Sequence, residues 1–244
     1  MTMMSDRKSQ HRYRQRLIQA AGTPAVEIII PKNGELRSRR IVSRSRARAT
    51  GKYPSWKMGR MMEWESQHEL NAFRWLDVDP AVTAFHEKPF MIRFSFDGRL
   101  CLRYPALLVE RLHCREVWDV RPNVKLLEPS VTAENAFLRS ELPALGFEYR
   151  AVDAELLTRQ PRLSNALTLL RYGRMPVTDV SMEHVRRILQ VTPMVLWQSA
   201  INGDLGQHGR EILCRLTLEG VLLFDLEKEL LPTSAFRFAD PTNG

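Results

Sequence analysis

The chain has 244 residues, of which 44% are hydrophobic and 26% charged, with a formal net charge of +8 at pH 7. This composition is typical of a globular protein with one large domain or two small ones. It excludes a membrane protein, because no apolar run approaches the roughly 18 residues that span a bilayer, and the polar N-terminus lacks the apolar segment of a signal peptide. We therefore expect a cytoplasmic protein without a membrane partner. Its three cysteines fit neither a disulfide framework nor a zinc site, so buried, reduced thiols are expected.

The positive charge is concentrated in the first quarter of the chain. Residues 1–60 contain 15 Lys and Arg against 3 Asp and Glu, so the remainder is net acidic. Arginine predominates there, and its bidentate grip on phosphate favours nucleic acid as a partner. The alternative is a solvated, disordered tail that binds nothing in particular. The candidate DNA-binding side chains are Arg37, Arg39, Arg40, Arg44, Arg46, Arg48, Lys52 and Lys57.

The first elements predicted along the chain are a basic helix over 5–20 and a strand over 26–30. An irregular, arginine-rich arm follows and completes a first region, residues 1–60. A helix is then predicted over 61–77 from the spacing of its apolar residues, and Asp79-Pro80 ends it.

The middle of the chain, residues 61–172, has the pattern of a mixed α/β domain. After the first helix come several short apolar segments separated by turn residues such as Asp97-Gly98. A helix over 132–145 and a strand over 147–152 follow. The predicted short strands cover residues 82–86, 90–96, 100–104, 107–110 and 116–120.

The last region, residues 173–244, has the order of a winged helix: three helices and then a short hairpin. The helices are expected over 182–189, 193–201 and 210–218, and the strand over 220–225. Such a domain docks protein as plausibly as it reads DNA. A stand-alone winged-helix regulator would need a basic recognition helix, but the third helix contains only two arginines.

A set of charged residues in the middle region has the types that phosphodiester hydrolysis requires. This reaction needs divalent cations, which carboxylates bind, and a positive charge near the phosphate. Glu69 lies on the predicted helix, with Glu65 one turn earlier as a possible helper. Asp119 and Arg121 share one face of a strand, and Glu116 faces the other side. Taken singly, Glu69 is typical of a solvated helix acid and Asp119 of a strand-end ion pair, so the hypothesis depends on their order and context.

Five short segments within residues 55–122 together resemble the TnsA family, the endonuclease subunits of heteromeric cut-and-paste transposases. They are Glu69-Leu70-Asn71-Ala72-Phe73-Arg74-Trp75-Leu76, Asp79-Pro80-Ala81-Val82, Phe85-His86-Glu87-Lys88-Pro89-Phe90, Pro105-Ala106-Leu107-Leu108-Val109 and Asp119-Val120-Arg121-Pro122. The resemblance implies that the family's helix glutamate corresponds to Glu69 and its Pro-Asp aspartate to Ala106. The family's Glu/Gln-x-Lys-Pro motif then corresponds to Asp119, Arg121 and Pro122.

The resemblance also implies a fold and a function. It implies a restriction-endonuclease-like core, a mixed sheet flanked by helices, followed by a smaller winged-helix-like domain. It implies cleavage at the 5′ ends of a transposon with Mg²⁺ or Mn²⁺, bound by Glu69, Asp119 and the Val120 carbonyl. The implied partners are double-stranded DNA, an integrase-type transposase that processes the 3′ ends, and an AAA+ regulator of transposition. The implied location is the bacterial cytoplasm, at the nucleoid.

Two residues depart from the family pattern at the catalytic positions. Ala106 replaces a carboxylate that would bind the metal directly, and such a loss lowers the rate on the order of a thousandfold or more. Arg121 keeps the positive charge of the family's lysine but cannot transfer a proton at ordinary pH. Two explanations stay open: a deliberate Asp-to-Ala change that traps an uncut complex, or a naturally degenerate subunit kept for assembly.

Replacement of Arg44, Arg46 and Arg48 by Ala is expected to weaken DNA binding to all sequences. Each lost phosphate contact should reduce the slope of log affinity against log salt by about 0.9. Titration of a labelled duplex at several KCl concentrations measures both quantities. Unchanged affinity and slope in the triple variant would exclude a phosphate-binding role for this cluster.

Overall fold

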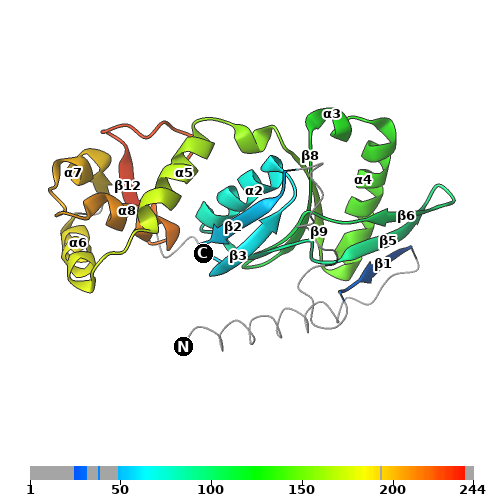
Figure 1. Ribbon diagram of the computed structural model, residues 1–244, viewed down its shortest axis with the longest axis horizontal. Coiled ribbons are helices and arrows are strands. Elements are labelled where there is room, and N and C mark those ends of the chain that lie inside the picture. Colours follow the sequence, from blue (N-terminus) through cyan, green and yellow to red (C-terminus); the bar gives the residue numbers. More distant parts are fainter. Residues whose placement is uncertain (1–24, 32–37, 39–48, 193, 240–244) are drawn as a thin grey trace. The chain divides into compact units, whose positions relative to one another are not determined.

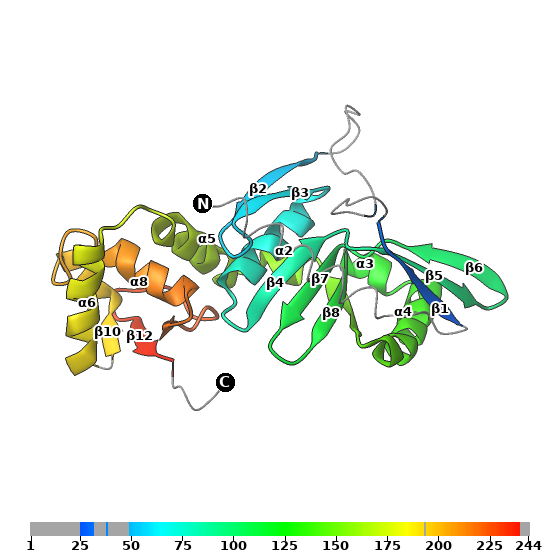
Figure 2. The same cartoon turned by 90° about the horizontal axis from the view of Figure 1, so that it is seen from below.

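The computed structural model describes residues 25–31, 38, 49–192 and 194–239, and this part of the chain is of mixed α/β class (Figures 1 and 2). The helix expected over 5–20 lies outside the described residues. The chain divides into two compact units. Unit 1 contains Met1–Tyr53, Met61–Glu69 and Val82–Leu156. Unit 2 contains Pro54–Arg60, Leu70–Ala81 and Leu157–Gly244.

A four-stranded sheet in the order β4-β7-β8-β9 forms the centre of unit 1. Its strands are β4 (Val82–Glu87), β7 (Leu107–Arg111), β8 (Arg115–Arg121) and β9 (Glu148–Asp153). β4, β7 and β8 pair antiparallel, whereas β9 pairs parallel with β8. A parallel neighbour needs a crossover connection, and here α4 (Pro129–Glu141) supplies it. All four strands were predicted, with bounds within one residue.

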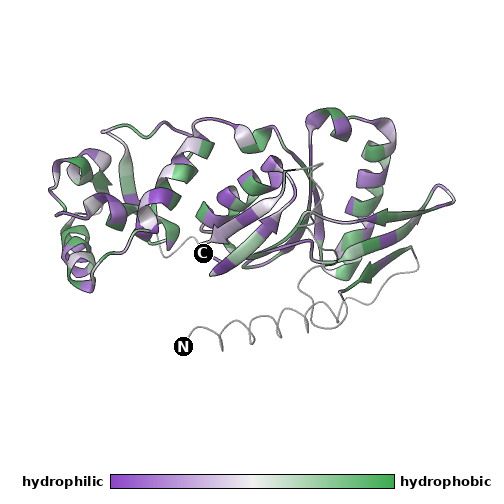
Figure 3. Ribbon diagram, viewed as in Figure 1, coloured by the Kyte–Doolittle hydropathy of each residue, from purple (hydrophilic) through white to green (hydrophobic). Residues whose placement is uncertain are grey.

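A second sheet of unit 1 has the order β1-β5-β6. Its strands are β1 (Val26–Ile29), β5 (Met91–Phe96) and β6 (Arg99–Arg103). The hairpin between β5 and β6 turns at Asp97 and Gly98, which have φ of 51° and 69°. Positive φ at both central residues is the geometry that Asp-Gly favours in a two-residue hairpin, so the predicted turn is confirmed. Apolar residues predominate along β1 and β5 (Figure 3).

The hydrophobic core of unit 1 joins both sheets to α4 and the 3₁₀ turn η1 (Leu142–Leu145). Leu138 of α4 and Val117 of β8 are completely buried. The rings of Phe90 and Phe147 lie 5.5 Å apart, and Gly146 ends the helical segment in the left-handed conformation. Leu108 and Val117 face this core, and the alternation along a strand puts the side chains of Ala106 and Asp119 on the same face of the sheet.

For the helix predicted over 61–77, the predicted first residue was wrong. Helix α2 covers Gln67–Val78, and Arg60–Trp64 form strand β3, which pairs with β2 (Gly51–Ser55) in the stretch expected to be irregular. Ser66 caps the helix because its hydroxyl accepts from the Glu69 amide at 3.2 Å. Gly51 packs against the ring of Trp64, where an added Cβ would lie 2.5 Å from the indole.

Unit 2 contains four helices from the second half of the chain and a three-stranded sheet in the order β10-β12-β11. The elements are α5 (Arg162–Gly173), α6 (Asp179–Val191), β10 (Met194–Leu196), α7 (Trp197–Asn202), α8 (Gly209–Leu218), β11 (Leu222–Leu223) and β12 (Ala235–Phe238). The helix expected over 193–201 therefore begins later, because β10 pairs with β12. The strand expected over 220–225 is only two residues long in the structure, as β11.

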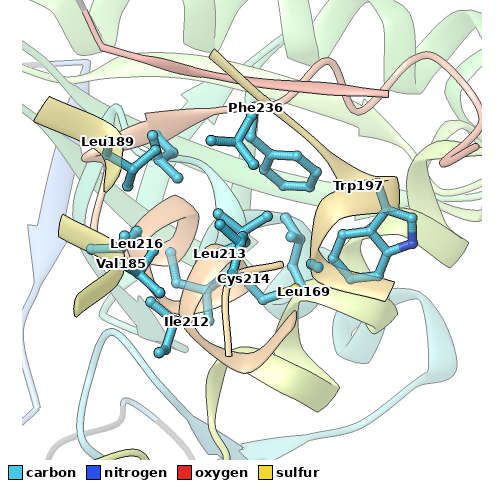
Figure 4. Close-up of a cluster of buried hydrophobic side chains, with 14 of the residues drawn as sticks. Leu169, Val185, Leu189, Trp197, Ile212, Leu213, Cys214, Leu216 and Phe236 are labelled. Carbon is cyan, nitrogen blue, oxygen red and sulfur yellow. The ribbon is translucent and has the colours of Figure 1, made fainter. Parts of the chain in front are cut away.

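A single apolar core holds the helices of unit 2 together (Figure 4). Leu213, Cys214 and Leu216 of α8 are buried in it beside Phe236 of β12. α5 approaches α8 so closely that a Cβ at Gly173 would lie 2.6 Å from Leu218. α5 therefore belongs with the residues that follow it, and the two units do not coincide with the expected regions 61–172 and 173–244.

The cysteines are all free, but they differ in burial. Cys214 is buried, and burial raises the pKa of its thiol to about 12. Cys101 and Cys114 are only half-buried, so the expectation of three buried thiols holds for one of them. No helix in the described part of the chain has the length and apolar character needed to cross a membrane.

Asp77, near the end of α2, is the polar centre of unit 2 and has no exposed surface. Its carboxylate accepts from the Ser55 hydroxyl at 2.6 Å and from the backbone amides of Trp56 and Lys57 at 2.9 and 3.1 Å. Arg174 completes the site with an ion pair at 3.0 Å. The carboxylate thus holds three sequence-distant segments of the unit in place.

Replacement of Asp77 by Ala is expected to lower the free energy of unfolding by about 3–5 kcal/mol, because Arg174 and two amides lose their buried acceptor. Urea denaturation measures the loss. Asp77→Asn should recover part of it, since one carbonyl oxygen remains. The control is Glu229→Ala, at an exposed position, with an expected change below about 0.5 kcal/mol. A loss for Asp77→Ala no larger than that of the control would contradict this role.

Candidate functional site

Glu69 lies in the first turn of α2 and is 7% exposed, so it is not a solvated helix acid. One carboxylate oxygen accepts from the backbone amide of Glu65 at 2.8 Å. The other lies 2.5 Å from the Nζ atom of Lys88. Glu65 was predicted to lie one turn before Glu69 on the same helix face, but this was wrong because the helix begins only at Gln67. The Glu65 carboxylate still reaches Lys88 at 3.1 Å. Glu69 thus combines a role at the helix start with a buried ion pair.

Ala106 immediately precedes β7 and is 4% exposed. Its amide donates to the Trp118 carbonyl at 2.9 Å, and its own carbonyl accepts from the Lys88 amide at 3.0 Å. The paired residues Leu107 and Trp118 show that Ala106 stands directly opposite Asp119 when the register is continued by one residue. Continuing the register of β4 in the same way puts Lys88 opposite Ala106 on the other side. Lys88, Ala106 and Asp119 therefore form one row across three neighbouring strands.

Asp119 of β8 is 6% exposed, and three groups surround one of its oxygens. Arg103 donates to this oxygen at 2.7 Å and Arg121 at 3.1 Å, and the hydroxyl of Tyr149 lies 3.2 Å away. The prediction that Asp119 and Arg121 share one face is confirmed by their ion pair. Val120, between them, is half-buried and pairs with Val152 of β9.

Arg103 lies at the end of β6 and connects the two sheets of unit 1. Its guanidinium pairs with Asp119 and also with Glu134 of α4. Burial by itself lowers the pKa of Arg103, but the neighbouring acidic groups, Asp119 first among them, outweigh this, so the pKa lies above its ordinary value. Burial raises the pKa of the Tyr149 phenol, and the Asp119 carboxylate raises it further, so the hydroxyl stays protonated.

Glu116 has no exposed surface, and its partners lie on the opposite face of β8 from Asp119, as predicted. It accepts from the indole of Trp118 at 2.7 Å and pairs with Arg111 at 3.0 Å and Arg150 at 2.9 Å. Ligand atoms of Cys114, Glu116 and Glu148 lie within 4.8 Å of one another. Because two arginines already neutralise Glu116, this cluster is better described as an ion-pair network than as a metal site.

The candidate DNA-binding residues divide into two groups. Arg37, Arg39, Arg40, Arg44, Arg46 and Arg48 lie outside the described residues. Lys52 is exposed on β2, where it can meet a phosphate. Lys57 is half-buried, and its ammonium donates to the Asp79 carbonyl at 2.6 Å, so it helps to hold the loop after β2.

The residues at Glu69 and Asp119 do not fit a bound Mg²⁺ or Mn²⁺. Magnesium prefers several oxygen ligands in near-octahedral geometry. Here the methyl group of Ala106 stands between Lys88 and Asp119 in the strand row. Glu69 and Asp119 are each already neutralised by a buried cation, Lys88 and Arg103 respectively. Phosphodiester hydrolysis with a metal would require these ion pairs to open.

A scan against models of known protein families finds no match, and a search among curated proteins finds no similar sequence. The relation to the TnsA family therefore stays a prediction from the motifs.

Sequence reasoning found the carboxylates but missed their partners, Lys88, Arg103 and Tyr149. The signals for these partners were weak, because Lys88 follows β4, Arg103 ends β6 and Tyr149 lies on β9, and only folding brings each of them to its carboxylate. One local signal was available: Ser66 three residues before Glu69 is the pattern of a helix start, and it predicts the observed beginning of α2.

Replacement of Arg103 by Gln is expected to lower the free energy of unfolding by about 3–5 kcal/mol, because the buried Asp119 loses its closest cation. Chemical denaturation measures the effect. The matched control is Arg93→Gln on β5, whose pair with Glu27 is about half exposed. The control should lose no more than about 1 kcal/mol. Equal losses in the two variants would show that the Arg103 pair contributes no more than a surface pair.

Proposed function

We propose that this chain is a TnsA-like subunit of a heteromeric transposase that binds transposon ends and assembles with an integrase-type partner without cutting DNA itself. The observation that carries the proposal is the strand row of Lys88, Ala106 and Asp119, with Glu69 joined to it by an ion pair. The residues that the motifs single out thus converge at one end of a mixed sheet. At that end, the position that should carry the central carboxylate carries a methyl group.

The fold supports the nuclease ancestry. The order α2, β4, β7, β8, α4, β9 gives a mixed sheet with a helix before it and a crossover helix within it. A restriction-endonuclease-like core has one carboxylate on a helix and two at the ends of adjacent strands. Glu69, Ala106 and Asp119 lie at positions of these three kinds.

The ion pairs of the site support a binding role over catalysis. An active centre would keep its carboxylates available to a metal ion and to the scissile phosphate. Here Glu69 and Asp119 are each less than 10% exposed and are bound by Lys88 and Arg103. These pairs favour a degenerate subunit over an active endonuclease, which is the alternative function.

The residues after Leu157 support a docking role. The order α6, β10, α7, α8, β11, β12 is that of a winged helix. Both arginines of α8 are engaged within unit 2: Arg210 lies over the ring of Tyr172 and Arg215 over that of Trp56. Arg215 also donates to the Gly173 and Met175 carbonyls. A helix whose cations are used in this way is better suited to support a protein contact than to read DNA.

The proposal is tested with a DNA fragment that carries one transposon end, labelled separately on each strand. We expect the chain and its partner transposase to form the same amount of DNA complex in Mg²⁺ and in EDTA, because binding depends on arginine–phosphate contacts. In Mg²⁺ or Mn²⁺ the partner should process the 3′ end, and the 5′ strand should stay intact on a denaturing gel.

Two results would contradict the proposal in different ways. Metal-dependent cutting of the 5′ strand would show that the chain is an active endonuclease. Failure to form any complex with the partner and the DNA would remove the role in transposition. The partner alone, without this chain, is the control for both strands.

A further inference from the structure

Lys88 has the most unusual environment of the candidate site. It follows β4 with a φ of +45°, a region that residues other than glycine rarely occupy, and it is only 4% exposed. Strained backbone of this kind persists where the surrounding structure holds it in place. The conformation therefore requires a compensating interaction.

Every polar group of Lys88 is used. Its amide donates to the Ala106 carbonyl at 3.0 Å, and its own carbonyl accepts from the amide and the hydroxyl of Ser38 at 2.8 and 3.1 Å. Its ammonium lies 2.5 Å from Glu69 and 3.1 Å from Glu65. The Lys88 ammonium, buried between two carboxylates, thus occupies the kind of place that a bound metal cation would occupy.

Each carboxylate of the site has a cationic side chain as its partner. Lys88 pairs with Glu65 and Glu69, and Arg103 and Arg121 pair with Asp119. Arg103 also pairs with Glu134. A divalent ion added beside Glu69 would face the Lys88 ammonium across a short distance in a buried place, where repulsion is screened little. A carboxylate restored at position 106 alone would leave this repulsion in place.

We propose that Lys88 is a resident cation that takes the place of a divalent metal at Glu65 and Glu69, and that Lys88 and Ala106 together keep metal out of the site. This deepens the proposed function and rests on it for the meaning of the site. Lys88 acts on the carboxylates and is a positioning residue. The inference implies that two changes, at positions 88 and 106, are needed to make the site bind metal.

The test is Mn²⁺ binding in the absence of DNA and partner. Titration calorimetry and the loss of the free Mn²⁺ EPR signal measure it. The variants are Ala106→Asp, the double variant Ala106→Asp with Lys88→Gln, and a matched control, Ala106→Asp with Lys88→Arg, which keeps the positive charge. We expect the Lys88→Gln double variant to bind Mn²⁺ at least tenfold more tightly than Ala106→Asp. The unchanged chain should show no saturable binding, and the Lys88→Arg double variant should bind Mn²⁺ no more tightly than Ala106→Asp.

Three results would overturn the inference. They are Mn²⁺ binding by the unchanged chain, Mn²⁺ binding by Ala106→Asp as tight as that by the Lys88→Gln double variant, and no Mn²⁺ binding by a folded Lys88→Gln double variant. Circular dichroism establishes folding. The Mn²⁺ measurement needs no DNA, so a failed transposition assay leaves its result unaffected. A failed Mn²⁺ measurement likewise leaves the proposed role in transposition unaffected.

A stability measurement covers the case in which the double variant does not fold. Lys88→Gly suits the positive φ but removes the ammonium. If Lys88 served only the turn, the protein would become more stable on this change. A resident cation predicts the opposite, a fall in Tm on the order of 5 °C or more. A Tm at or above that of the unchanged chain would overturn the inference.

Discussion

A carboxylate that leaves water must keep a positive partner, and this constraint organises much of the polar structure of the chain. Glu69, Asp77, Glu116 and Asp119 are all less than 10% exposed, and each is held by a lysine or an arginine. An unpaired charge in such a place is far more costly than a broken surface pair. The folded chain therefore depends on bringing distant cations to these acids, and Arg103 and Lys88 do so across strands.

Under the proposed function, the same constraint explains how the scaffold can keep its fold without a bound metal ion. Once a carboxylate is absent at position 106, the remaining acids still need compensation, and side chains can provide it permanently. Lys88 and Arg103 give unit 1 a stable polar interior that does not vary with the supply of cations.

Local pattern predicted the strands of unit 1 well. The apolar segments of β4, β7 and β8 are short and bounded by turn residues, and Asp97-Gly98 required the hairpin that is observed. α2 was predicted six residues too early because Met61 and Trp64 extend its apolar spacing backwards, although they belong to β3. β2 was missed, since Lys52 and Pro54 give it no apolar alternation.

The sequence predicted the carboxylate positions of the candidate site but not their partners. The positions of Glu69, Ala106 and Asp119 follow from motifs that are continuous in sequence. Their partners follow from strand register and tertiary packing, which single residues do not encode: Lys88 reads as part of a loop, and Arg103 as the end of an exposed hairpin. α5 was missed for a related reason, because its place beside α8 depends on the absence of a side chain at Gly173.

The hydrogen bonds between Ser38 and the Lys88 carbonyl have a geometrical consequence for DNA. They attach one point of the arginine-rich sequence to the end of the four-stranded sheet. Arg37 and Arg39 are the covalent neighbours of Ser38, so under the proposed function a phosphate bound by either side chain would lie at a limited distance from the strand row. An unattached tail would set no such limit, so under the proposal this attachment restricts where the DNA backbone can lie relative to the four-stranded sheet.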